Sequence, residues 1–109
     1  DPTKKKIIRI GVFEPLTGEN GGGGFQEVLG MRYANKMYPT VTIQGEEYKV
    51  ELDEVDNKSD KTEAITAAQR LVSDWCTVVL GSYGSGVSIG KFLQMPIFQP
   101  LVRLVPIHR

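Results

Sequence analysis

The stretch VELDEVDNKSDKTEAITAAQRLVSDWCTVVLGS, residues 50–82, places a helix between two strands. Alternating apolar residues predict a strand that runs to Val55, and CTVVLGS predicts a buried strand that ends in glycine. Between them, Ser59 or Asp60 can cap a helix, and Glu63 follows Asp60 at the spacing of a capping box. A strand, a helix and a strand of these lengths predict a parallel crossover unit. The predicted core face of this helix consists of Ala64, Ile65, Ala68, Leu71 and Val72.

The same alternation continues toward the N-terminus. IIRIGVF, residues 7–13, is a β-branched run that predicts a buried strand, and the glycine-rich EPLTGENGGGG after it predicts a loop that cannot be helical. A second helix follows and stops before Pro39. Its predicted apolar stripe, with one polar exception, consists of Phe25, Val28, Leu29, Arg32, Tyr33 and Met37.

The remaining segments complete the sheet. VTIQGEEYKV predicts a small hairpin with its turn near Gln44 and Gly45, which leads into the strand up to Val55. SGVSIGKFLQM predicts a short helix ended by Pro96, and IFQPLVRLVPI has strand composition that its two prolines confine to a sheet edge. We therefore predict an α/β fold with a doubly wound parallel sheet and helices on both faces, a three-layer α/β/α arrangement.

Composition excludes several function classes. A chain of 109 residues suits one domain, and its 13 basic and 13 acidic residues cancel, so nothing favours nucleic acid or an acidic membrane as a partner. Cys76 is the single cysteine, which rules out an internal disulfide and a paired-cysteine metal site. The chain starts at Asp1 without an apolar signal segment, so we expect a processed start; it also has no run of about 18 apolar residues that would span a membrane.

Three loops lie where the predicted strands end: EPLTGENGGGG, DNKSD and GSYGSG. Ligands of such sheets bind beyond the carboxyl ends of the strands, and glycine beside a helix N-terminus suits a carboxylate or phosphate. The dinucleotide and phosphate-loop patterns both fail on spacing, and Phe92 replaces the hydroxyl residue that would hold magnesium. No catalytic spacing involves His108, and we interpret Glu51, Asp53 and Glu54 as a solvated strand edge rather than an acid/base pair.

IRIGVFEPLTGENGGGGFQEVLGMRYAN, VELDEVDNKSDKTEAITAAQRLVSD and VVLGSYGSGVSI resemble the N-terminal lobe of the periplasmic-type (type I) substrate-binding proteins of branched-chain amino-acid ABC importers. The resemblance covers roughly Lys6 to Lys91. It implies one incomplete lobe of a two-lobed protein that closes on its ligand, without catalysis or a cofactor. It also implies a secreted parent protein, periplasmic or extracellular and lipid-anchored, whose partners are an amino acid or related zwitterion or amide and the importer's membrane subunits.

The resemblance assigns a ligand carboxylate to the serine-rich loop after the third strand. Ser85 is the best candidate, with Gly84 and Gly86 beside it and Tyr83 as a wall. The loop from Gly21 to Gly24 would line the mouth of the site, so Gly23 and Gly24 complete the predicted ligand-binding residues, listed together as Tyr83, Gly84, Ser85, Gly86, Gly23 and Gly24. The alternative is that these glycines only make tight turns.

The sequence changes character after Lys91, and every Asp and Glu lies at or before Asp74. The resemblance implies a fourth strand and a Ser-Cys-Thr-Asn-Pro-type ligand loop there, and the chain has no such loop. If one A was lost from AAA-ATT-CTT beneath Lys91, codons permitted by the tail spell ILADANIPAVGTSCTNPQ in the other frame. We therefore expect a partial ligand-binding lobe at residues 1–91 and an out-of-frame tail at residues 92–109. Such a chain binds weakly or not at all; the alternative function is a self-associating module, dimeric through its tail or a sheet edge.

Overall fold

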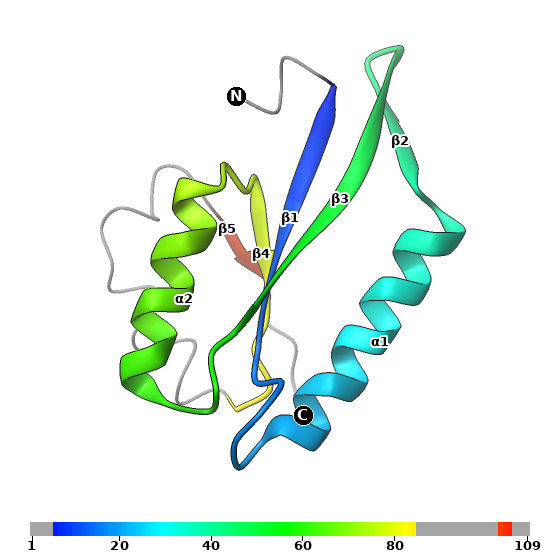
Figure 1. The fold of residues 1–109 in the computed structure, drawn as a ribbon. Helices are drawn as coiled ribbons and strands as arrows, with labels where there is room; N and C mark the ends of the chain where they lie inside the picture. Colours follow the sequence, from blue (N-terminus) through cyan, green and yellow to red (C-terminus); the bar gives the residue numbers. More distant parts are fainter. Residues whose placement is uncertain (1–5, 85–102, 106–109) are drawn as a thin grey trace.

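The computed structural model describes residues 6–84 and 103–105, which form an α/β fold (Figure 1). One five-stranded sheet has the strand order β2-β3-β1-β4-β5. Strands β1, β3, β4 and β5 are parallel, and β2 pairs antiparallel with β3. The elements are β1 (Ile7–Glu14), α1 (Gly21–Met37), β2 (Thr40–Ile43), β3 (Glu46–Asp56), α2 (Lys61–Ser73), β4 (Val78–Leu80) and β5 (Arg103–Val105). The predicted fold class is confirmed.

The helices α1 and α2 lie on opposite sides of the strands (Figure 1). The chain moves one way across the sheet from β1 to β3 and the other way from β3 to β4, so right-handed crossovers place α1 and α2 on opposite faces. The tail contributes β5 at the sheet edge beside β4, which confirms the predicted edge strand at Arg103–Val105. The short helix predicted before Pro96 falls outside the described residues.

The predicted hairpin is confirmed, and its turn chemistry explains it. Gln44 has a φ of 51° and Gly45 a φ of 81°, so both central residues of the two-residue turn are left-handed. This conformation matches the twist of antiparallel strands and favours glycine. The turn brings β3 back along β2, with Glu47 opposite Thr42.

The face of the sheet under α2 holds the main hydrophobic core. Leu71 is fully buried, and Gly11 of β1 leaves room for it, because a Cβ at Gly11 would lie 3.1 Å from the Leu71 side chain. The core residues are Phe13, Val55, Ala64, Ala67, Ala68, Leu71, Cys76 and Val79, with Val72 packed against them. Ile65 was predicted in this face and is 39% exposed, so that assignment is wrong. The small Ala67 lies in the core instead, because the helix packs closely over the strands.

The predicted apolar stripe of α1 is wrong except at Val28, which is buried. The other four apolar members are between 42% and 65% exposed: Phe25, Leu29, Tyr33 and Met37. Arg32, the polar member of the stripe, donates two hydrogen bonds, of 2.8 and 2.7 Å, to the Glu54 carboxylate of β3. A groove of about 560 Å³ remains between α1 and the sheet, lined by Ile10, Glu27, Gly30, Met31, Ala34, Asn35, Tyr38, Val50, Leu52 and Leu80.

The four consecutive glycines, predicted to be loop, form the first turn of α1. The cause is close packing against the preceding chain. A Cβ at Gly24 would lie 1.9 Å from the carbonyl oxygen of Pro15, and the Gly24 N–H donates to the Asn20 carbonyl at 3.0 Å. Contact with the β1–α1 loop therefore outweighs the low helix propensity of glycine.

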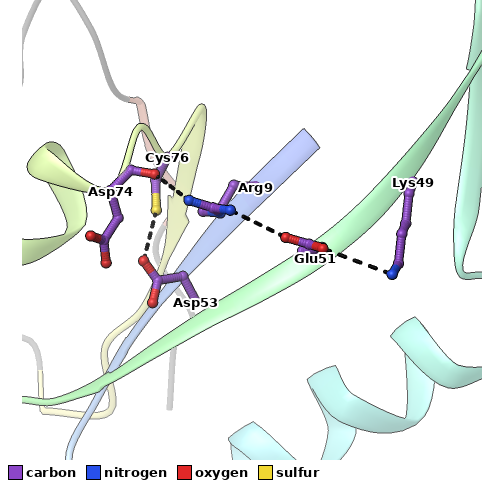
Figure 2. Close-up of polar contacts among 6 residues, drawn as sticks. All are labelled: Arg9, Lys49, Glu51, Asp53, Asp74 and Cys76. Carbon is purple, nitrogen blue, oxygen red and sulfur yellow. Dashed lines mark hydrogen bonds and ion pairs between the residues drawn. The ribbon is translucent and has the colours of Figure 1, made fainter. Parts of the chain in front are cut away.

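Asp53 lies on β3 within a polar cluster (Figure 2). Strand β3 runs between β2 and β1, so the interpretation of its acidic residues as a solvated strand edge is wrong. Arg9 donates to Glu51 at 3.3 Å and to the Asp74 carbonyl at 2.8 Å, and the Cys76 thiol donates to Asp53 at 3.6 Å. Burial first, and then hydrogen bonding and repulsion from Asp74, raises the pKa of Asp53 to about 6. Burial raises the pKa of Cys76 to about 12, so this residue stays a thiol at neutral pH.

Gly24→Ala should destabilise the chain, and Gly22→Ala should stabilise it. A methyl group at Gly24 meets the Pro15 backbone, and such overpacking costs about 1–3 kcal/mol. A methyl group at Gly22 meets nothing within 4 Å, and alanine at a compatible position gains about 0.4–1 kcal/mol. Urea unfolding of the two variants measures both effects. Equal effects of the two substitutions would contradict the described start of α1.

Asp53→Asn should change how stability depends on pH. Since the folded-state pKa of Asp53 is about 6, above its ordinary 3.8, the folded protein binds a proton that the unfolded chain releases. The resulting stabilisation is complete below pH 3.8 and is lost as the pH rises through 6. The asparagine variant lacks this loss, so it should exceed the wild type in stability at pH 8 and lose that advantage at pH 4. Urea unfolding across this range measures how the free energy of unfolding changes with pH, with the exposed Glu47→Gln as control. Parallel profiles for the wild type and Asp53→Asn would contradict a raised pKa of Asp53.

Candidate functional site

The carboxyl ends of three parallel strands meet at one edge of the sheet. Glu14 at the end of β1 lies opposite Asp56 at the end of β3, and Val12 lies opposite Leu80 at the end of β4. The loops that follow these strands are residues 15–20, 57–60 and 81–84. This is the edge at which ligands bind in open parallel sheets.

The Asp56 carboxylate ties the first loop to the second. One oxygen accepts the N–H groups of Leu16 and Lys58, both at 2.8 Å, and the other accepts the Thr17 hydroxyl at 2.7 Å. Burial would raise the pKa of Asp56, but these donors outweigh it and hold the pKa below its ordinary value. Asp56 is therefore ionised at neutral pH and joins the two loops by charge-assisted hydrogen bonds.

Ser59 and Asn57 extend the same network. The Ser59 hydroxyl accepts the Asn20 N–H at 3.0 Å and donates to the Thr17 carbonyl at 3.2 Å. Asn57 is fully buried, and its amide donates to the Ser82 hydroxyl at 3.1 Å. The second loop thus contacts both of the others, and the Asp60 carboxylate caps α2 by accepting the Glu63 N–H at 2.9 Å, as the capping pattern predicts.

Glu14 connects the first loop to the third. Its side chain is fully buried, and one carboxyl oxygen accepts the N–H of Tyr83 at 2.7 Å. Burial, followed by a hydrogen bond to Glu27, raises the pKa of Glu14 to about 8. Glu14, Asn57 and Ser82 are not among the site residues predicted from the sequence. The signal for Glu14 is an acidic residue directly after an apolar strand.

A pocket of about 480 Å³ opens where the third loop meets the first turn of α1. It is lined by Gly22, Gly23, Gln26, Glu27 and Tyr83. The Tyr83 ring lies against the helix so closely that a Cβ at Gly23 would be 2.5 Å from it. The glycine run therefore makes room for the aromatic side chain and exposes main chain to the pocket.

Only some of the predicted site residues line this pocket. Tyr83 and Gly23 line the pocket together, whereas Gly24 is buried against Pro15 and does not line it. Gly84, with a φ of 88°, lies beside Asn20, whose Nδ2 would be 3.0 Å from an added Cβ. Ser85 and Gly86 fall outside the described residues. Ligand contact by these residues stays a prediction.

Two further site classes find no support in the part of the chain that the structure describes. Residues 6–84 and 103–105 contain no group of three or more His, Cys, Asp and Glu side chains that could hold a metal ion. Neither α1 nor α2 has the length and the apolar composition to cross a membrane.

Solved structures share this fold. No protein-family model and no curated protein sequence matches the chain. The leucine-binding protein LivK of Thermotoga maritima matches with a TM-score of 0.75 and 29% identity, over 92% of this chain and 27% of its own. The branched-chain amino acid transporter substrate-binding protein LivJ of Streptococcus pneumoniae, solved in complex with isoleucine, matches with a TM-score of 0.74 and 24% identity, over 93% and 28%. An ABC-type branched-chain amino acid transporter protein of Rhodopseudomonas palustris matches with a TM-score of 0.66 and 18% identity, over 94% and 28%.

This chain therefore spans little more than a quarter of the length of each of these proteins. The match covers more than nine-tenths of this chain. The structural neighbours of this chain are the substrate-binding proteins of branched-chain amino-acid ABC transporters, and the resemblance is confirmed.

Proposed function

We propose that the parent protein of this lobe captures a branched-chain amino acid or a related small zwitterion or amide outside the cytoplasm and delivers it to an ABC importer, without catalysing a reaction. One observation carries the proposal: hydrogen bonds join the three strand-end loops, and the third loop forms a pocket with the N-terminal part of α1. The leucine-binding and isoleucine-bound neighbours support the class of ligand. Periplasmic or extracellular localisation, with or without a lipid anchor, follows from the same family.

The ligand carboxylate would bind to the third loop. The Tyr83 N–H is already donated to Glu14, so this amide is not available to a ligand. The remaining donors of the predicted set are the main chain around Gly84 and Gly86 and the hydroxyl of Ser85, with Tyr83 and Gly23 forming the wall. Gly24 supports this arrangement indirectly, because it lets α1 start against Pro15.

This chain should bind such a ligand weakly or not at all. In the family the ligand is gripped between two lobes, and residues 1–91 supply one partial lobe. Each charge-assisted hydrogen bond that is lost costs about 1.5–3 kcal/mol. Three such losses weaken binding by about a thousandfold or more.

Calorimetric titration of the chain with leucine and with isoleucine should therefore show no tight binding. The physical reason is that the ligand stays half solvated at the open rim of one lobe. A submicromolar dissociation constant for either amino acid would contradict the proposal that half of the binding site is missing.

We also propose that residues 92–109 are an out-of-frame tail beyond the partial lobe at residues 1–91. The pairing of β5 with β4 shows that Arg103–Val105 has strand geometry, and the open edge of a sheet can pair with a short segment of another origin. The ligand loop of the hidden frame would fall where β5 lies. Sequencing the gene decides the proposal: the expected result is the hidden frame ILADANIPAVGTSCTNPQ, and any other second frame refutes it.

Self-association is the second candidate function. The four exposed apolar side chains of α1, together with Val41 and Ile43 of the edge strand β2, which are 39% and 45% exposed, favour contact with another copy. Sedimentation of the whole chain at increasing concentration, compared with a variant that lacks residues 92–109, tests this alternative. A concentration-dependent dimer lost on deletion supports association through the tail, and a monomer at all concentrations excludes it.

A further inference from the structure

Two carboxyl groups, those of Glu14 and Glu27, lie next to each other, and Glu27 lines the 480 Å³ pocket. Glu14 is fully buried, and after its hydrogen bond to Tyr83 its second oxygen, Oε2, has no partner among the described residues. Both carboxyl oxygens of Glu27 are also buried without a hydrogen-bond donor in that part of the chain. Buried polar atoms are nearly always hydrogen-bonded, so these acceptors need a proton shared between the two groups and a further donor from outside.

A proton shared between Glu14 and Glu27 satisfies one oxygen of each group and leaves the second Glu27 oxygen without a partner among the described residues. An ionised carboxylate only accepts hydrogen bonds, and two adjacent carboxylates ionise together only if a donor or a cation lies between them. The raised pKa of Glu14, caused by burial and then by Glu27, means that the pair retains one proton at neutral pH. The pair therefore keeps one negative charge.

Within residues 6–84 and 103–105, no ion pair neutralises this charge. Arg9, Arg32, Arg70, Lys6 and Lys49 make the ion pairs of the described residues, and all of these pairs are with other carboxylates. Gln26 and Tyr83 line the pocket beside Glu27, and the Tyr83 N–H donates to Glu14. The amide of Asn57, from the end of β3, is already donated to Ser82.

The pocket itself connects this charge to a ligand. Glu27 lines it together with Gly22 and Gly23, which belong to the first turn of α1. The N–H groups of a helix's first turn carry partial positive charge, and no acidic side chain neutralises them in this turn. The pocket therefore has partial positive charge from the first turn of α1 and negative charge from the Glu27 carboxylate. This arrangement complements the two opposite charges of a zwitterion.

We propose that Glu27, with Glu14 behind it, binds the ammonium group of a primary-amine ligand in this pocket. The ammonium donates to the unpaired carboxyl oxygens, and the proton that the pair shared passes to solvent as both groups ionise. For a zwitterionic ligand the inference rests on the proposed function, because the carboxylate then binds the neighbouring loop. For a simple amine it stands alone.

Nuclear magnetic resonance of the whole chain can test the ammonium site separately from the proposed carboxylate site, with three probes of similar shape. These are leucine, 3-methylbutylammonium, which lacks the carboxylate, and 4-methylpentanoate, which lacks the amine. The amide signals of Gly22, Gly23 and Tyr83 and the carboxyl carbon signal of Glu27 report on the pocket. Glu27→Gln removes the charge at nearly constant shape, and Glu19→Gln, in the exposed loop before α1, is the matched control.

We expect 3-methylbutylammonium to shift the pocket signals in the wild type and in Glu19→Gln. Glu27→Gln should weaken its binding about tenfold or more, the change expected for losing a charge-assisted hydrogen bond, and should not weaken the binding of 4-methylpentanoate. The Glu27 carboxyl signal of the wild type keeps the test valid if the variant does not fold.

An amine that moves none of these signals at tens of millimolar overturns the inference, and so does an equal affinity of the wild type and folded Glu27→Gln for it. A different result bears on the proposed function alone. If the amine binds while leucine and 4-methylpentanoate both leave the Gly84 amide unmoved, the ammonium site stands and the carboxylate site fails.

Discussion

The Asp56 carboxylate is the interaction on which the functional edge of this lobe depends. Parallel strands end side by side, but their loops diverge unless something holds them, and Asp56 accepts donors from two loops at 2.7 to 2.8 Å. Because these donors keep the carboxylate ionised, the connection is charge-assisted and stronger than a neutral hydrogen bond. Asn57 and Ser59, next to it in sequence, extend the same connection to Ser82 and Asn20.

These hydrogen bonds between the loops explain why the pocket forms where it does. Once the first loop is fixed, Pro15 lies against Gly24 and sets the start of α1. Once the third loop is fixed, the Tyr83 N–H reaches Glu14 and the ring lies over Gly23. The pocket is therefore a consequence of backbone geometry at the rim, with small residues making room and one aromatic residue forming the wall.

The sequence predicts much of the fold because strong local signals agree with the tertiary structure. The Asp60 cap, the hairpin turn at Gln44 and Gly45 and the alternating strands each have a local physical cause. The errors arise where long-range contacts decide. Pro15 and Tyr83 pack against the glycine run of α1, and Arg32 of α1 pairs with Glu54 of β3. Neither contact is visible in the local sequence pattern. Glu14 was missed for the same reason, since its burial depends on a loop about seventy residues away in the chain.

Amide hydrogen exchange at Leu16 tests most directly whether Asp56 holds the rim together. The Leu16 N–H donates to the Asp56 carboxylate, so it should exchange far more slowly than an unstructured amide, and Asp56→Ala should remove that protection while the Ala68 amide in the middle of α2 stays protected. Rapid exchange at Leu16 in the wild type, or unchanged protection in Asp56→Ala, would show that the loops are not joined in this way.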